Sequence, residues 1–542
     1  MRTAWLLALS LAAACGDDTS NPGTGDGGSD DAAPDGAVSS CDPPGHFGVP
    51  QTTFLLPKSS ATGFSYNDVQ AAFPQVDWMT LDRLYLPAGR YTNILVGNLP
   101  VRTADRPLVI TNQGGQFFIG NNPNGNYLWS FNGGANWIIT GRYDAESQTG
   151  DAAFPGHACG NYADSPGAYG ILSDDEYAFA APYLHMGIAV GGGATDFEIE
   201  YVEIMRSGFA GIRLLNSPSE GTDKPMANVR VHDTYVHDVA GEGYYFGWTG
   251  TPPSNKFPGL QIYNNRILRT GNEALQIQDL GDGAHIHHNT FVSGGLRWLD
   301  NGLGRYQDSL AQVLVREGTI TFDHNVFIDG AGTLLSFFSS PQPGDGDRHV
   351  TFSDNYFSDA ISLGMYLNGT SAAPSTFAWE RNVFRNFDFA YTPVDPAATD
   401  PNMITGKNGA FMAPVTFSAN SWFGTDRIVA GIAGGDGTSG NITLTGNLHE
   451  DAEAIVLLDG PWSTAGHHVT SWAANATVAT GSPAVTYRAG DIVTHGPAPT
   501  LYRATATSMG TPPPGAAWTV IPTPTDDVRV MPGSRYAAYG VR

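Results

Sequence analysis

Two glutamates stand at matching places in two consecutive segments of the chain. Glu242 lies in GEGYYFGW (241–248) and Glu273 lies in GNEALQIQ (271–278), each just before a short run of alternating apolar residues. If the segments stack as neighbouring strands, the carboxylates are about 5 Å apart, which is near the separation of a retaining glycosidase pair. Such proximity raises the pKa of one carboxyl, as a general acid requires. The glutamates could instead accept hydrogen bonds from a turn or bind a cation.

An elimination reaction would need a different set of residues. A base must remove the proton next to a uronate carboxylate, while an arginine or Ca²⁺ neutralises that carboxylate. The candidates in the same part of the chain are Arg213, Arg269, Arg297, Arg305 and Arg316, with His237, Tyr245 and Tyr306 as partners. Of these, Arg213, His237 and Arg297 join the two glutamates as catalytic candidates.

Acidic clusters offer the only indication of a cofactor. QDLGDG (278–283) and PGDGDRH (343–349) have the oxygen-rich composition of Ca²⁺ loops, which makes Asp279 and Asp282 candidate ligands. Gly-Asp turns are also common without a cation. The histidines of HIHH (285–288), with His232 and His237, show no carboxylate or cysteine spacing that completes a zinc motif, so we expect a polar strand face there.

A repeat positions these residues. Each unit has a short alternating strand, a polar corner and a second short strand, and the earlier units add a third strand. The units are FEIEYVEIMRSGFAGIRLL (197–215), VRVHDTYVHDVAGEGYYFG (229–247), LQIYNNRILRTGNEALQIQ (260–278), AHIHHNTFVSGG (284–295), ITFDHNVFIDGAGTLLSFF (320–338), VTFSDNYFSDAISLGMYLN (350–368), FAWERNVFRN (377–386), VTFSANSWFG (415–424) and ITLTGNLHED (442–451). Such a repeat predicts a solenoid with one unit per coil.

An asparagine recurs at one place in the units: Asn265, Asn289, Asn325, Asn355, Asn382, Asn420 and Asn447. Stacked asparagines can hydrogen-bond along a column and satisfy the backbone groups of a corner. With this column, the repeat resembles the right-handed parallel β-helix of the pectate-lyase-like superfamily. Segments 81–100 and 106–115 resemble the first coils of secreted β-helix polysaccharide lyases, 64–73 a capping helix and 528–540 a closing strand. We therefore expect an all-β, single-stranded parallel β-helix over residues 46–470.

The resemblance implies that polysaccharide binds in a groove over one face of the β-helix, although no catalytic motif of the superfamily's lyases is present. Alternation along the third strand directs Ile212, Leu214, Tyr244, Phe246, Leu275 and Ile277 inward. It directs outward, in one strip, Arg213, Tyr245, Gln276, Ser336 and Tyr366. Insertions at 216–228, 249–259, 299–319 and 339–349 are expected to follow this strand and to wall the groove. The expected substrate-binding residues are Tyr245, Gln276, Gln278, Trp248, Tyr306 and Tyr366.

The composition agrees with a turn-rich β protein, since Gly numbers 67 and Pro 36 in 542 residues. A net charge of −25 disfavours nucleic acid and anionic membrane surfaces as partners. It also disfavours uronate polymers unless Ca²⁺ bridges them to the protein.

The first residues, MRTAWLLALSLAAACGDD, form a secretory signal pattern. They resemble a bacterial lipoprotein signal with Cys15 as the lipidated residue, although Ala12 stands where leucine is usual. Residues 16–45 lack apolar content and are expected to be a disordered tether. In an exported protein Cys41 and Cys159 are expected to pair as a disulfide. We expect a monomer that reaches the outer membrane only through its lipid anchor, or else is secreted.

A small module is expected at 471–524, followed by a closing strand at 525–542. Residues 487–518 resemble a chitin- or cellulose-type carbohydrate-binding module, in which Tyr502 and Trp518 occupy matching positions. The exposed aromatics that this family carries after the second tyrosine are replaced by Thr505, Ala506 and Thr507. The module is thus either sugar-binding or purely structural.

Together these features predict a surface-tethered enzyme that degrades polysaccharide, as a glycan lyase or a glycoside hydrolase. The alternative is a non-catalytic, glycan-binding or adhesive surface protein, and a C5-epimerase is more distant. Part of the enzyme prediction rests on fold analogy. Titratable groups that converge in the groove would distinguish an enzyme from a binding protein.

Overall fold

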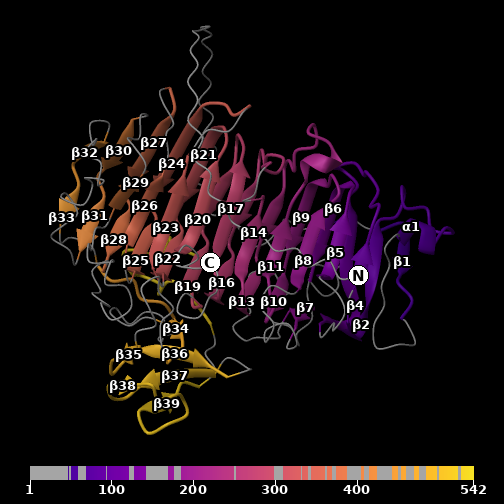
Figure 1. The fold of residues 1–542 in the computed structure, drawn as a ribbon. Helices are drawn as coiled ribbons and strands as arrows, with labels where there is room; N and C mark the ends of the chain where they lie inside the picture. The colour runs from indigo at the N-terminus through magenta and orange to yellow at the C-terminus, as the bar shows by residue number, and fades with distance from the viewer. Residues whose placement is uncertain are drawn as a thin grey trace.

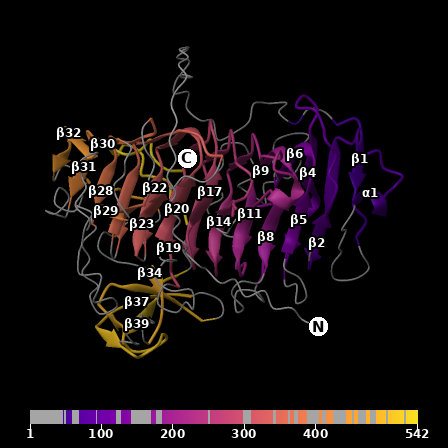
Figure 2. The same cartoon turned by 45° about the horizontal axis from the view of Figure 1, so that its top comes forward.

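The computed structural model of the chain describes residues 47, 50–58, 69–92, 94–120, 127–141, 169–175, 185–248, 252–297, 309–330, 332–339, 344–360, 363–368, 374–386, 404–407, 414–423, 442–449, 453–458, 469–474, 484–496, 500–522 and 526–541. These residues form a parallel β-helix whose coils advance from the indigo to the orange end of the ribbon (Figures 1 and 2). The predicted all-β solenoid is confirmed. None of the helices in these ranges has the length and apolar character needed to cross a membrane.

Each complete coil contributes three strands, and strands at equivalent positions pair in parallel to form three faces. The first face contains β1 (Thr53–Leu55), β2 (Arg83–Tyr91), β4 (Leu108–Ile119), β6 (Ala135–Thr140), β9 (Thr195–Glu200), β12 (Arg230–His232), β15 (Gln261–Tyr263), β18 (His285–His287), β21 (Gly318–Asp323), β24 (Arg348–Ser353), β27 (Thr376–Glu380), β30 (Val415–Ser418) and β32 (Ile442–Thr445). The second face contains the later parts of β2 and β4, then β7 (Ile171–Asp174), β10 (Val202–Met205), β13 (Tyr235–Val239), β16 (Arg266–Thr270), β19 (Thr290–Gly294), β22 (Val326–Gly330), β25 (Tyr356–Ala360), β28 (Val383–Arg385), β31 (Ser421–Phe423) and β33 (Leu448–His449).

The third face is a separate sheet. Its strands are β3 (Ile94–Val96), β5 (Tyr127–Asn132), β8 (Met186–Gly191), β11 (Ala210–Leu214), β14 (Glu242–Phe246), β17 (Leu275–Leu280), β20 (Ser309–Val315), β23 (Thr333–Phe338), β26 (Leu363–Asn368) and β29 (Ile404–Lys407). All six residues expected to point inward from these strands are buried in the core. The prediction that 299–319 is an insertion after a third strand is wrong. Residues 309–315 form β20, which is itself the third strand of its coil, so the insertion precedes that strand.

Stacked side chains fill the space between the three faces. Phe322, Phe352, Trp379 and Phe417 form one column, in which successive ring centroids are 4.3, 5.3 and 5.0 Å apart. An aromatic residue stands at this place in four successive coils, so flat rings meet face to face and exclude water. This packing holds neighbouring coils in register.

The predicted asparagine column is confirmed at the corner between the first and second faces. From Asn265 to Asn447, each side-chain amide donates to the Oδ1 of the next asparagine at 2.9–3.1 Å. Each amide also donates to a backbone carbonyl of the preceding coil, as Asn325 does to Ile286 at 2.8 Å. The column thereby satisfies corner groups that no strand pairing serves.

Two further elements accompany the coils. The capping helix is represented by α1 (Val69–Ala72). Alongside the coils, β34 (Val469–Ser471), β36 (Ile492–His495), β37 (Thr500–Ala504) and β39 (Trp518–Val520) form a small sheet, and β35 (Thr486–Tyr487) pairs with β38 (Ser508–Met509) (Figure 1).

The C-terminal tail, residues 526–541, differs from the predicted closing strand. Within these residues the only strand-like pairing is an isolated bridge between Leu457 and Val530. The tail lies against the second face, where Val528, Val530, Tyr536 and Val541 share a hydrophobic cluster with residues of that face. Because the tail is a run of turns, it can follow the side of the coils. A strand that closed the β-helix would instead pair with its last coil.

Candidate active site on the third face

The central strip of the third face runs across successive coils. Backbone pairing places Arg213 beside Tyr245, Tyr245 beside Gln276, and Ser336 beside Tyr366. Gln312 fills the place between Gln276 and Ser336. The sequence analysis missed Gln312 because it did not recognise β20 as a strand.

Glu242 and Glu273 stand one coil apart at the edge of this strip. The N–H of Gly243 donates to the carbonyl oxygen of Glu273 at 2.8 Å, which fixes the two residues in register. A side chain at Gly243 would meet the core atom Ile267 Cγ2 at 2.5 Å, so Gly243 faces the core, as does its neighbour Tyr244. Two adjacent core-facing residues interrupt the alternation, and Glu242 is thereby turned outward.

The contacts of Ser309 agree with this placement. Ser309 follows Glu273 in the edge column, one coil further on, and its hydroxyl hydrogen-bonds the hydroxyl of Ser336 at 2.7 Å. Since Ser336 belongs to the central strip, the side chains of the edge column and of the central strip lie on the same outward side of the sheet, where Glu242 and Glu273 are buried. The glutamates therefore lie beside Tyr245, Gln276 and Gln312.

Burial governs the protonation of Glu242. Its side chain is 4% exposed, and burial raises its pKa to about 7, although a hydrogen bond from Asn272 Nδ2 to Oε1 at 3.1 Å opposes the rise. Its Oε2 has no hydrogen-bond partner among the described residues. The raised pKa lets this carboxyl keep its proton at a higher pH than an exposed glutamate does, and Oε2 can carry that proton. Glu273 is fully buried.

A groove of about 660 Å³ opens on the N-terminal side of this pair. Its floor includes Ser130, Ala189 and Arg213, and its walls include Glu220 and Trp248. Glu220 closes the turn η2 (Pro218–Glu220) by accepting from Ser217 N–H at 3.1 Å, which holds the wall in place. Because Arg213 pairs with Tyr245, the groove leads directly to the coil that carries Glu242.

Amide and aromatic side chains continue the surface on the C-terminal side. Gln278 donates to Gln312 at 3.3 Å. Phe338 lies one coil further and Tyr366 two coils further; their rings meet edge to face at 6.2 Å, and both are half-buried. Aromatic side chains thus lie on both sides of the glutamates, Trp248 in the groove on one side and Phe338 and Tyr366 on the other.

The other predicted catalytic residues lie in different surroundings. Arg297 lies beside the corner before Glu273, where its N–H donates to the carbonyl of Gly271 at 2.9 Å. His237 is on the second face, held between Glu203 at 3.1 Å and Asp238 at 2.8 Å. Burial lowers the pKa of His237, but these carboxylates outweigh it, so the pKa is raised. The structure thus separates His237 from the glutamates.

The two predicted Ca²⁺ ligands do not converge. Asp279 is buried and accepts from Arg316 Nη1 at 2.9 Å and from Ser254 Oγ at 2.5 Å. Asp282 is exposed and accepts from the N–H of Thr319 at 2.8 Å. Protein donors therefore occupy both carboxylates, and they serve to hold adjacent coils together.

In the C-terminal module the predicted sugar-binding aromatics contact the core of the module itself. Trp518 is 8% exposed, packs edge-on against Tyr487 at 5.4 Å and donates Nε1–H to Thr511 at 3.0 Å. Tyr502 packs against the same small core. The predictions for Tyr306, for lipidation at Cys15 and for the pair Cys41 and Cys159 lie outside the described residues.

A second polar cluster was missed by the sequence analysis. Glu198 and Glu200 of β9 meet His232 of β12 on the first face, where all three are buried. The two glutamates precede His232 by 34 and 32 positions in the chain, so no local motif could show the cluster. Only the pairing of coils brings them together.

No protein-family model matches the chain, and a search of curated proteins finds no match either. Among solved structures, a GH136 lacto-N-biosidase from Eubacterium ramulus is 9% identical, with a TM-score of 0.40 over 68% of this chain and 62% of that chain. The chain thus spans less than two thirds of that enzyme. A GH87 alpha-1,3-glucanase from Streptomyces thermodiastaticus is 13% identical, with a TM-score of 0.37 over 77% and 71%. An endo-xylogalacturonan hydrolase from Aspergillus tubingensis is 9% identical, with a TM-score of 0.34 over 69% and 96%. Likenesses at this level assign no activity to this chain.

Proposed function

We propose that the protein is a glycoside hydrolase that cleaves polysaccharide on its third face. The observation that carries the proposal is the pair Glu242 and Glu273, stacked one coil apart, with the pKa of Glu242 raised to about 7. Adjacent coils lie about 4.8 Å apart, which is close to the separation of the carboxyls in retaining enzymes, about 5–5.5 Å.

The proposed reaction assigns one role to each carboxyl. Glu242 gives its proton to the glycosidic oxygen as the bond to the anomeric carbon breaks, and the Glu273 carboxylate attacks that carbon. Water then attacks the resulting glycosyl ester, giving its proton to Glu242 and releasing Glu273. Each turnover consumes one water and restores both carboxyls.

Binding groups on both sides of the pair support a polymeric substrate. Arg213 and Trp248 line the open groove on one side, and Phe338 and Tyr366 lie on the other. A sugar chain that crosses the coils would contact both, with the cleaved bond over the glutamates. Neutral chains are favoured because the protein carries a net charge of −25.

The test incubates the full-length exported protein with neutral and uronate polysaccharides, with and without Ca²⁺. We expect new reducing ends without the ultraviolet absorbance of an unsaturated sugar, and loss of activity in Glu242→Gln and Glu273→Gln. The matched control is Glu380→Gln, an outward carboxylate on the first face, which should cleave normally. Reducing ends with that absorbance would show a lyase instead. Polysaccharide binding without cleavage would favour the non-catalytic surface protein.

We further propose that Cys15 is lipidated and that residues 16–45 tether the enzyme to a bacterial outer membrane. The N-terminal sequence supports this proposal. Cys15→Ala should move the protein from the detergent phase to the aqueous phase in a phase-partition experiment. If the wild type and Cys15→Ala both partition into the aqueous phase, the protein is simply secreted.

A further inference from the structure

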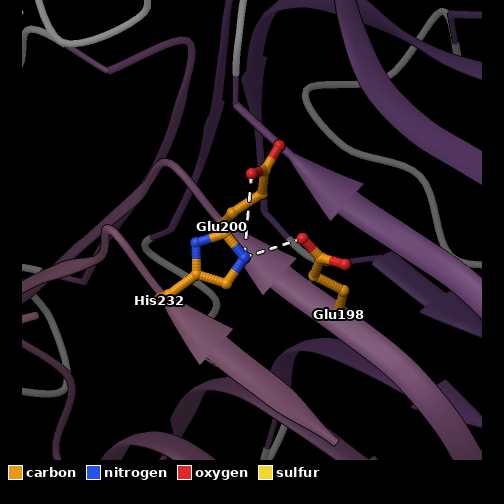
Figure 3. Close-up of side chains that lie close together, drawn as sticks. All are labelled: Glu198, Glu200 and His232. Carbon is orange, nitrogen blue, oxygen red and sulfur yellow. Dashed lines mark hydrogen bonds and ion pairs between the residues drawn. The ribbon is translucent and has the colours of Figure 1, made fainter. Parts of the chain in front are cut away.

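The cluster of Glu198, Glu200 and His232 is built from two paired strands of the first face (Figure 3). On β9 the core-facing Ile199 separates the two glutamates, so both carboxylates point outward. Backbone pairing sets His232 of β12 directly beside Glu200. A Glu-x-Glu strand and a histidine on the next coil thus converge at one point.

The three side chains direct donor atoms at one another. His232 Nε2 is 2.7 Å from Glu198 Oε1 and 3.8 Å from Glu200 Oε2. Two ligands about 2.0–2.1 Å from a tetrahedral zinc ion lie about 3.3–3.4 Å apart, a value between these two distances. Binding a tetrahedral cation would lengthen the first distance by about 0.6 Å and shorten the second by about 0.5 Å.

Neighbouring residues fix the orientation of the imidazole. Asp233 Oδ2 lies 2.7 Å from His232 Nδ1. The ring of Tyr263, from the next coil, stacks on the imidazole at 4.4 Å and 6°. A carboxylate on the far nitrogen is the usual support of a metal-binding histidine, because it fixes the tautomer and aims the other nitrogen at the metal.

Arg230 orients one of the two glutamates in the same way. It pairs with Glu198 Oε2, which leaves Glu198 Oε1 directed at His232. In His232 and in Glu198, the potential ligand atom is therefore distinct from the atom that the supporting residue holds. His232 and Glu198 are 2% exposed and Glu200 is 0% exposed, so the donor set is pre-arranged away from bulk water.

We propose that Glu198, Glu200 and His232 bind one divalent transition-metal ion, with Zn²⁺ as the representative. One imidazole and two carboxylates suit such an ion, whereas Ca²⁺ takes six to eight oxygen ligands. The ion would join β9 to β12 and leave a fourth position for water. It would act on the first face, apart from Glu242 and Glu273 on the third, so the inference does not depend on the proposed hydrolase.

The test measures Zn²⁺ binding to the chelator-treated full-length protein by titration calorimetry. We expect one tight site per chain, and a loss of affinity of at least 100-fold in Glu200→Gln and in His232→Gln. Asp233→Asn, which keeps all three ligands, should weaken binding by about 10–100-fold. The matched control is His287→Gln, which removes another stacked imidazole of the first face and should bind Zn²⁺ as the wild type does.

Several outcomes would overturn the proposal. These are no Zn²⁺ binding by the wild type, equal binding by wild type and Glu200→Gln, or tighter binding of Ca²⁺ than of Zn²⁺. If the ligand variants fail to fold, Co²⁺ added to the wild type gives a separate test. We expect a bound, low-symmetry Co²⁺ to give visible absorption bands, and added Zn²⁺ to abolish them. The absence of these bands at saturating Co²⁺ would reject the site.

Discussion

At the scale of single residues, position in the coil determines what a carboxyl can do. Glu242 and Asp279 are both buried on the outer side of the sheet, yet Asp279 has an arginine and a serine hydroxyl as partners and Glu242 has one amide. Burial raises the pKa of both carboxyls, and an arginine and a serine oppose that rise at Asp279, whereas one amide opposes it at Glu242. The weaker opposition supports Glu242 as the acid.

The pKa of Glu242 predicts the pH dependence of cleavage. Activity should fall as the pH rises through about 7, because the buried carboxyl loses the proton that it must donate. Glu242→Gln should lower kcat by roughly 10²–10⁴-fold and abolish this alkaline limb. Rates measured from pH 5 to 9 test the prediction, and an unchanged alkaline limb in the variant would assign the acid elsewhere.

The same shift predicts a change in stability. The folded protein binds the Glu242 proton more tightly than the unfolded chain does, so the free energy of unfolding should fall as the pH rises from about 4.5 towards 7. The loss approaches roughly 3 kcal/mol. Glu242→Gln should remove this slope. Urea unfolding at several pH values measures it, and parallel slopes in both proteins would contradict the shift.

At the scale of elements, the asparagine column carries a large share of the corner hydrogen bonds. Asn325 donates to Ile286 and Asn355 and accepts from Asn289. Asn325→Ala should lower the free energy of unfolding by roughly 2–5 kcal/mol, because it leaves buried partners unsatisfied on both sides. The control is Asn447→Ala at the last described rung, where the side chain is partly buried and the loss should be smaller. If urea unfolding shows equal losses of free energy in the two variants, the interior asparagines contribute no more to stability than the terminal one.

The elements also show which features the sequence could predict. Repeated asparagines and alternating apolar residues identify the first and second strands, because each coil repeats the same physical requirement. The strand at Ser309–Val315 was missed because an insertion separates it from its coil. The register of Glu242 and Glu273 was predicted from spacing, whereas the outward turn of Glu242 depends on the packing of Gly243 against Ile267, which no local pattern shows. Glu198 and His232 required knowledge of which coils pair.

At the scale of the whole molecule, the C-terminal tail joins distant parts of the chain. Asp526 is fully buried, and its carboxylate accepts two hydrogen bonds from Arg269, at 2.7 and 2.8 Å, and one from the hydroxyl of Tyr235. Further along, the N–H of Val541 donates to Thr290 Oγ1 at 3.0 Å and that of Gly540 to the carbonyl of His324 at 2.7 Å. The tail therefore contacts several successive coils of the second face.

Removing the Asp526 carboxylate should be strongly destabilising. Asp526→Asn removes one of the two carboxylates paired with the buried guanidinium of Arg269, and we expect a loss of roughly 3–5 kcal/mol in the free energy of unfolding. The control is Asp527→Asn, whose carboxylate pairs with nearby Arg529 at the surface and should cost less than about 1 kcal/mol. Calorimetric melting of both variants tests this difference, and similar melting temperatures would contradict it.

The path of the tail also bears on how the molecule folds and comes apart. In a stack of repeats, each coil couples mainly to its neighbours, so a solenoid can lose coils from its ends one after another. A strap fastened to several coils at once couples them beyond nearest neighbours and makes their loss cooperative. The strap follows the coils in the sequence. The coils can therefore stack before the strap docks, and they become a single cooperative unit only when residues 526–541 are in place.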